Sequence, residues 1–173
     1  MPNTTPSDNA PAAKEVEYSD LHRGEMLERT QWAREFSWHQ LQVLARHMRT
    51  FEAENGTLLF REGDRGSYMC LIARGKASVV KGDQSYGMKY LATLGPGKTF
   101  GEMALFDAEP RSASVVATEK TLLLVLTKEG FEALAAEMPQ LALRLVMKLA
   151  RMMSERLRKT SGALSEHLER IDK

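Results

Sequence analysis

The middle of the chain, from Thr50 to Leu126, alternates short apolar runs with glycine-rich turns. Nine of the twelve glycines lie between Gly56 and Gly101, and they divide the region into short pieces of strand-like composition. Several short strands at regular spacing are typical of an antiparallel sandwich or barrel. The pattern therefore predicts a mainly β fold with flanking helices, a jelly roll (double-stranded β-helix barrel). The candidate strands are residues 57–60, 68–73, 77–81, 89–94, 114–117 and 122–126.

Helical patterns precede this β-rich region. Ser37 and Gln40 have the spacing of a capping box, in which each side chain satisfies a backbone N–H of the other end of the first turn. Apolar residues then recur at helical period, which predicts a helix over residues 38–47. A weaker helical pattern covers residues 20–34.

A second helical region follows the strands. Pro139 interrupts a short helix, because proline fits at a helix start and not in its interior. Residues 140–159 contain neither glycine nor proline, and they predict a long C-terminal helix. Apolar residues spaced by seven predict that this helix pairs with a second copy of the chain in a homodimer. The alternative is that the same residues only cover the barrel. The heptad positions are Leu143, Ala150, Leu157, Leu164 and Ile171.

These patterns give a provisional domain organisation. The first residues are rich in Pro, Asn, Thr and Ser, which bury too little apolar surface to offset the entropy of ordering them. The predicted divisions are a mobile tail (1–18), N-terminal helices (19–48), the barrel (49–127) and C-terminal helices that serve as lid and dimer surface (128–173).

Composition narrows the function classes. The 173 residues have a net charge of +1, which argues against a dedicated nucleic-acid binder. Cys70 is the single cysteine, so disulfides within the chain and cysteine-based zinc clusters are excluded, and the scattered histidines predict no metal site. No signal peptide is visible, and the longest apolar run, 122–126, is too short to cross a bilayer. We expect a soluble, cytoplasmic protein.

The segment 100–114, FGEMALFDAEPRSAS, has the chemistry of an anion site. Gly101 permits close backbone approach, and the short turn after it directs backbone N–H groups toward one point. Arg111 can give two charge-assisted hydrogen bonds to a phosphate, and Ser112 adds a hydroxyl. The Glu102 carboxylate suits a sugar 2′-hydroxyl better than a phosphate. The segment therefore predicts a site for a small phosphorylated ribose.

This segment closely resembles the phosphate-binding cassette of cyclic nucleotide-binding domains, F-G-E-x-A-L-x…P-R-x-A. Two upstream stretches, GTLLFREGDRG from Gly56 and LIARGKA from Leu71, are also similar to that family, and the likeness covers roughly residues 35–160. In this family Glu102 would hold the ribose 2′-hydroxyl and Arg111 would pair with the cyclic phosphate. The resemblance implies that the cradle is completed by Gly101, Met103, Ala104, Ser112 and Ala113.

The base is less clearly specified. Family members that prefer cyclic GMP often have threonine directly after the cassette arginine, and Ser112 at this position does not decide the matter. By a gapless match to the bacterial catabolite activators, Arg156 and Leu157 take the places of two small hydroxyl residues, a departure from the usual hydrogen bonds to adenine. Arg156 would stack on the base or, alternatively, stay solvated. We expect cyclic AMP in preference to cyclic GMP. A cyclic di-GMP-binding variant is an alternative, with Arg156 or Arg158 meeting the second phosphate.

No motif of a helix-turn-helix, kinase, cyclase or channel follows the cassette, and no set of catalytic groups can be assembled, so no enzyme activity is expected. The prediction is a stand-alone bacterial receiver whose ligand rearranges the C-terminal helix and so signals to an unidentified effector protein. A DNA-binding regulator of the catabolite activator family is the alternative, because residues 140–173 hold eight Lys/Arg against four Asp/Glu.

Overall fold

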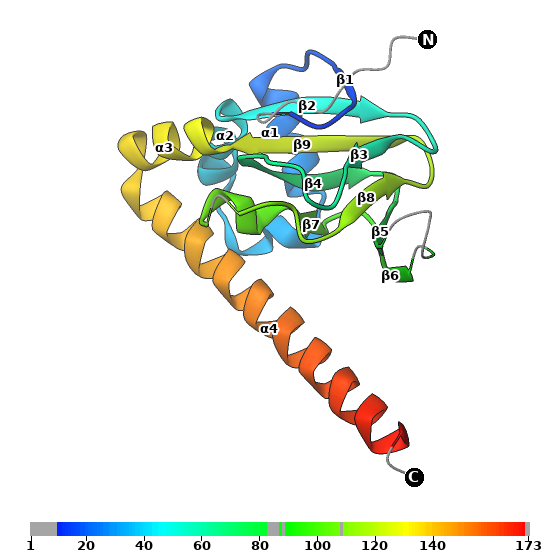
Figure 1. The fold of residues 1–173 in the computed structure, drawn as a ribbon. Coiled ribbons are helices and arrows are strands. Elements are labelled where there is room, and N and C mark those ends of the chain that lie inside the picture. The colour runs from blue at the N-terminus through cyan, green and yellow to red at the C-terminus, as the bar shows by residue number, and fades with distance from the viewer. Residues whose placement is uncertain (1–9, 83–86, 88, 108, 172–173) are drawn as a thin grey trace. The chain divides into compact units, whose positions relative to one another are not determined.

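The computed structural model describes residues 10–82, 87, 89–107 and 109–171 (Figure 1). The chain divides into two compact units, one up to Leu134 and one from Ala135 onward. The elements, in chain order, are β1 (Lys14–Glu15), α1 (Asp20–Glu28), η1 (Gln31–Glu35), α2 (Trp38–Arg46), β2 (Met48–Ala53), β3 (Leu58–Phe60), β4 (Tyr68–Arg74), β5 (Ala77–Lys81), β6 (Lys89–Leu94), β7 (Thr99–Phe100), η2 (Glu102–Leu105), β8 (Ser114–Ala117), β9 (Thr121–Thr127), α3 (Lys128–Glu137) and α4 (Pro139–Ile171).

The strands form two sheets in which every pairing is antiparallel. One sheet has the order β1-β2-β9-β4-β7 and the other has the order β3-β8-β5-β6. In Figure 1, β2, β9 and β4 run side by side. The central strand β9 is buried along almost its whole length, which explains its unbroken apolar run. This arrangement confirms the predicted mainly β jelly roll with N-terminal helices and a long C-terminal helix. Its core cluster includes Phe51, Leu59, Ile72 and Leu123.

All six predicted strands are present, with ends that differ by one residue at most, but β2 and the two-residue strands β1 and β7 were not predicted. The strand β2 contains polar Arg49 and Glu52, and it pairs with β9 along six consecutive residues. The predicted mobile tail is wrong for residues 10–18, because β1 pairs with β2 and Ala12 N donates to the carbonyl of Leu59 at 3.1 Å. An edge strand is held by its backbone and needs few apolar side chains. Residues 1–9 lie outside the described part of the chain.

The N-terminal helices follow the sequence signals closely, with one exception. The capping box of Ser37 and Gln40 is present at the start of α2. The predicted helix over 20–34, however, is two helices, α1 and η1. Thr30 between them has extended backbone, and its hydroxyl donates to the carbonyl of Leu27 at 2.7 Å, a local bond that ends the first helix.

The second unit consists of the end of α3 and the helix α4. The proline that opens α4 occupies a position where its missing N–H costs nothing. The helix continues to Ile171, beyond the predicted 140–159, and Gly162 lies inside it. No helix in the described ranges is long and apolar enough to cross a membrane. Three heptad positions of α4 are exposed apolar residues, Leu143, Leu157 and Leu164.

Candidate functional site

The backbone of Arg111 is fixed against the turn that follows β3. Arg111 N donates to the carbonyl of Asp64 at 2.8 Å, and Gly63 N donates to the carbonyl of Arg111 at 2.9 Å. The Asp64 carboxylate in turn accepts from Arg61 N at 2.8 Å, which closes the turn. These bonds place Arg111 at the start of the path into β8, beside the end of β3.

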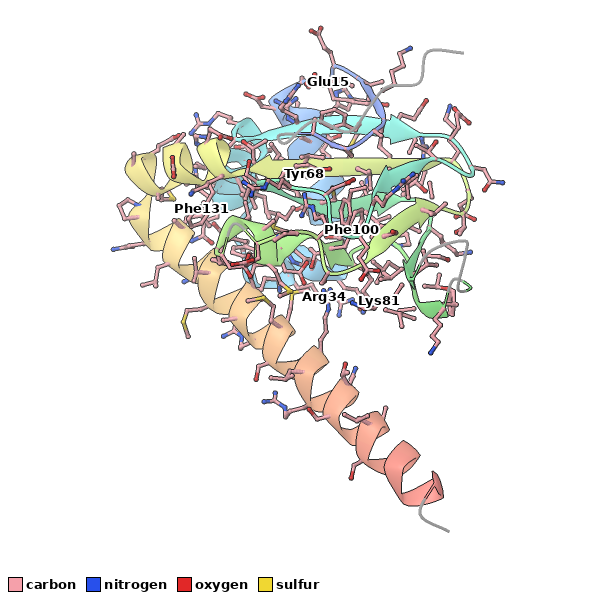
Figure 2. All side chains as sticks on the ribbon, viewed as in Figure 1. Glu15, Arg34, Tyr68, Lys81, Phe100 and Phe131 are labelled. Atoms are coloured by element: carbon pink, nitrogen blue, oxygen red, sulfur yellow. The ribbon has the colours of Figure 1, made fainter. Side chains whose placement is uncertain are left out.

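The Arg111 side chain is buried and lies against two aromatic rings. Its guanidinium carbon is 4.2 Å from the ring centre of Phe60 and 4.3 Å from that of Tyr68. The two rings are edge to face, with centres 6.3 Å apart. Figure 2 shows Tyr68 on β4 within the barrel. Cation–π contact of this kind stabilises a guanidinium that has lost its water.

Arg111 is only 5% exposed, yet its hydrogen bonds are incomplete. Nη1 donates to the carbonyl of Gly101 at 3.0 Å. Nε and Nη2 are buried and have no hydrogen-bond partner among the described residues. Buried charged groups are normally paired, because leaving a donor unsatisfied costs about 1–3 kcal/mol or more. Two buried, unsatisfied donors on one guanidinium are chemically suited to an anion.

Two glycines keep this position open. A Cβ atom added to Gly66 would lie 2.7 Å from Arg111 Nη2, and one added to Gly101 would lie 2.7 Å from Nη1. Gly101 also has a positive φ of 75°, a conformation that other residues rarely adopt. A side chain at either position would crowd the guanidinium.

The turn η2 follows Gly101 directly and contains the second charged group. Glu102 is 3% exposed and Ala104 is 4% exposed, whereas the side chain of Met103 is half exposed. A carboxylate this deeply buried is unusual unless it meets hydrogen-bond donors or charges.

The charges of Arg111 and Glu102 both act on Cys70, which pairs with Phe100 across β4 and β7. Burial raises the pKa of the Cys70 thiol to about 12, while the Arg111 charge lowers it and the Glu102 charge raises it. Cys70 is a free, buried thiol that stays protonated at neutral pH, as an inert core residue should. Burial likewise raises the pKa of Tyr68, so its hydroxyl also stays neutral.

The structure brings most of the predicted site residues together. Gly101, Glu102, Met103 and Ala104 form one turn, and Arg111 bonds to its first residue. Ser112, which is exposed, and Ala113, which is partly exposed, lead from Arg111 into β8. Arg156 lies on α4 in the second unit, where it is exposed, and its contact with a base stays a prediction.

Sequence reasoning did not single out Phe60, Tyr68 or Gly66. Phe60 and Tyr68 end and begin strands, where an aromatic residue is ordinarily assigned to the core. Gly66 ends the stretch GTLLFREGDRG, and a second glycine three residues after Gly63 was the available signal. The described residues hold no cluster of three or more His, Cys, Asp or Glu side chains suited to a metal ion.

A model of the cyclic nucleotide-binding domain matches residues 50–138, just over half of the chain. The chain belongs to this family. The match includes every element that contacts Arg111, from the end of β3 to the start of β8.

Similar proteins support this membership. The cyclic AMP receptor protein of Thermus thermophilus is 42% identical over 100 residues, which are 58% of this chain and 46% of that protein. The Pycsar effector protein XpPycTIR of Xanthomonas perforans is 36% identical over 107 residues, 61% of this chain and 33% of that protein. This chain thus spans about half or less of the length of these two relatives.

Solved structures of cyclic nucleotide-binding proteins also resemble this chain. A cyclic nucleotide-binding domain from Methylobacillus flagellatus superposes with a TM-score of 0.73 at 30% identity, and the match covers 84% of each chain. The catabolite activator protein of Thermus thermophilus gives a TM-score of 0.69 at 32% identity, covering 78% of this chain and 61% of that one. The chain is therefore a cyclic nucleotide-binding domain related to the catabolite activator regulators.

Proposed function

We propose that this chain binds cyclic AMP through residues 101–104 and 111–113. The observation that supports this most directly is the pair of buried donors on Arg111, Nε and Nη2, which lack a partner in the described structure. Both donors lie in the plane of one guanidinium, so one phosphate can accept from both at once. The glycines beside them leave room for the phosphate to approach.

Glu102 would accept a hydrogen bond from the ribose 2′-hydroxyl. A carboxylate repels a phosphate, so its place in the same turn as Gly101 favours a ligand with a hydroxyl next to its charged group. Backbone groups of Gly101, Met103 and Ala104, with Ser112 and Ala113, complete the contacts to the ring of ribose and phosphate.

Adenine is the preferred base in this proposal. The support is the Thermus thermophilus relative, which is named a cyclic AMP receptor protein. Arg156 on α4 would stack on the base through its guanidinium plane. No observation on the cassette itself favours cyclic GMP or cyclic di-GMP, and both serve as competing ligands in the test.

The domain would signal to a protein partner through a change in α4. Ligand binding would rearrange this helix, and its exposed apolar positions, Leu143, Leu157 and Leu164, would pair with a second copy of the chain. A DNA-binding regulator of the catabolite activator type is the second candidate, and the named regulators among the relatives favour it.

The test is calorimetric titration with cyclic AMP, cyclic GMP and cyclic di-GMP. Micromolar binding corresponds to about −8 kcal/mol, and we expect it for cyclic AMP alone. In Glu102→Met the affinity should fall for cyclic AMP and not for its 2′-deoxy analogue, because only the former presents the hydroxyl. Absence of binding by a folded wild type would overturn the proposal.

Amide hydrogen exchange across residues 139–171, with and without the ligand, tests the signalling step. Slower or faster exchange on binding would support a rearranged helix, and unchanged exchange would contradict it. DNA binding that depends on the ligand would instead favour the second candidate.

A further inference from the structure

Three strand ends meet beside the cassette. In the sheet ordered β3-β8-β5-β6, β8 lies between β3 and β5. Glu62 follows the end of β3, Lys81 is the last residue of β5, and Ser112 precedes the start of β8 between them. Lys81 is labelled in Figure 2.

An ion pair between Lys81 and Glu62 crosses over the cassette backbone that lies between these two strand ends. Lys81 Nζ lies 3.0 Å from Glu62 Oε1 and also donates to the carbonyl of Ser112 at 2.9 Å. Flanking strands are about 10 Å apart when one strand lies between them, so two long side chains are needed to meet across it. The ammonium therefore rests on the carbonyl of the residue directly after Arg111.

Glu62 is held from two further sides. Its Oε2 accepts from Gly82 N at 3.1 Å, and its own backbone N donates to Ser114 Oγ at 2.9 Å. The Gly82 N–H and the Lys81 ammonium lower the pKa of Glu62, so the pair is fully charged at neutral pH. Both neighbours of Ala113 are thereby tied to this network, one through its carbonyl and one through its hydroxyl.

An exposed ion pair of this kind adds little to folding stability, and Lys81 is 55% exposed. The pair should therefore affect mainly the local conformation of the backbone that it contacts. Arg111 N and O are fixed by the turn at Gly63 and Asp64, but the chain after Arg111 enters β8 only at Ser114. The Lys81–Glu62 pair is what restrains the carbonyl of Ser112 in this interval.

We propose that Glu62 and Lys81 are positioning residues for the ligand, holding the backbone of Ser112, directly after Arg111, in the binding conformation before the ligand arrives. This inference rests on the proposed function of the cassette. A site that is already ordered loses less conformational entropy on binding and releases its ligand more slowly.

A simpler role for Lys81 is that of a positive charge that attracts the phosphate. The two roles give opposite results for Glu62→Gln. This substitution raises the local positive charge, so attraction alone predicts tighter binding. It also removes the carboxylate that holds Lys81 on the Ser112 carbonyl, so the positioning role predicts weaker binding.

The experiment compares cyclic AMP affinity and dissociation rate in Lys81→Met, Glu62→Gln and the double variant. We expect each single change to raise Kd about 5- to 10-fold, mostly through faster dissociation. The double variant should be no weaker than either single one, because both changes break the same pair. Lys81→Arg keeps a charged donor and should bind nearly as the wild type does.

Lys76→Met is the matched control. Lys76 is also 55% exposed, precedes the same strand β5, and pairs with Glu119 at 3.7 Å away from the cassette. It removes an equal charge and should change Kd less than about twofold. Melting temperatures of the unliganded variants should all stay close to that of the wild type.

The outcomes separate the two proposals. A folded wild type that binds no cyclic nucleotide would overturn the proposed function and this inference with it. A wild type that binds, with Lys81→Met no weaker than Lys76→Met, would overturn the positioning role alone. Tighter binding by Glu62→Gln would do the same, since it assigns Lys81 to simple attraction.

Discussion

Two arginines lie over aromatic rings in this domain, and they differ in what meets their remaining donors. Arg49 on β2 is 5.2 Å from the ring centre of Phe51, and its Nε and Nη2 both donate to the Glu15 carboxylate from β1. Arg111 lies over Phe60 and Tyr68, but its Nε and Nη2 have no hydrogen-bond partner in the described ranges. The same two atoms are satisfied in one case and unsatisfied in the other.

Under the proposed function, this difference separates a structural arginine, Arg49, from a ligand-binding one, Arg111. Arg49 is about half exposed, so its ion pair with the edge strand β1 requires little desolvation and adds little to the free energy of unfolding. Arg111 is buried, so its desolvation is costly unless its remaining donors are paired. An anion that accepted from those donors would offset much of this cost.

The largest expected effect comes from replacing each arginine by methionine. Arg111→Met removes two charge-assisted hydrogen bonds to the phosphate, each worth about 1.5–3 kcal/mol, so cyclic AMP affinity should fall at least about 100-fold. The free energy of unfolding of the unliganded domain should stay within about 1 kcal/mol or rise, because an incompletely paired buried charge is lost. Calorimetry and urea unfolding measure the two quantities.

Arg49→Met should show the opposite combination. Its affinity for cyclic AMP should equal that of the wild type, and its unfolding free energy should fall slightly through the loss of an exposed pair. If Arg111→Met destabilises the unliganded domain strongly while Arg49→Met weakens binding, the assignment of the two arginines is wrong.

A smaller effect is expected from crowding the binding arginine. Gly66→Ala places a Cβ atom 2.7 Å from Arg111 Nη2, so the guanidinium must shift by some tenths of an ångström. Misplaced hydrogen bonds should weaken cyclic AMP binding about 10-fold, measured by calorimetry. Gly95→Ala is the control, since no atom lies within 4 Å of its added Cβ. Equal affinities in the two variants would mean that Gly66 does not limit the space at Arg111.

The sequence predicted much of this site because its parts are local. Gly101, Glu102 and Arg111 lie within eleven residues, so their chemistry could be interpreted from one stretch. The glycine-rich turns between the apolar runs likewise located the strands. The capping box at Ser37 was predictable for the same reason, since both of its partners are in one turn.

What the sequence did not predict depends on long-range pairing. Phe60 and Tyr68 reach Arg111 only once β3 and β4 are in separate sheets, and Lys81 reaches Ser112 only because β5 lies beside β8. The strand β1 was assigned to a mobile tail because its order comes from backbone bonds to β2, which leave no hydrophobic pattern.

The smallest predicted effect is the pH dependence of the stability that the Arg49–Glu15 ion pair contributes. The hydrogen bonds from Arg49 lower the pKa of Glu15, so this carboxyl binds protons more weakly in the folded chain than in the unfolded one. Its contribution to stability is therefore complete above the unfolded pKa of about 4.3 and is lost as the pH falls through the lower folded pKa. Figure 2 labels Glu15 at the surface of the domain, so solvent limits the contribution to about 0.5 kcal/mol.

The measurement is the difference in unfolding free energy between the wild type and Arg49→Met, by urea at pH 7 and near pH 3. Carboxyl groups away from this pair titrate alike in both proteins and cancel in the difference. We expect a small advantage for the wild type at pH 7 that disappears at the lower pH. An advantage that persists at low pH would assign it to the contact of Arg49 with Phe51, which does not titrate, and the two arginines would then differ less than their hydrogen bonds indicate.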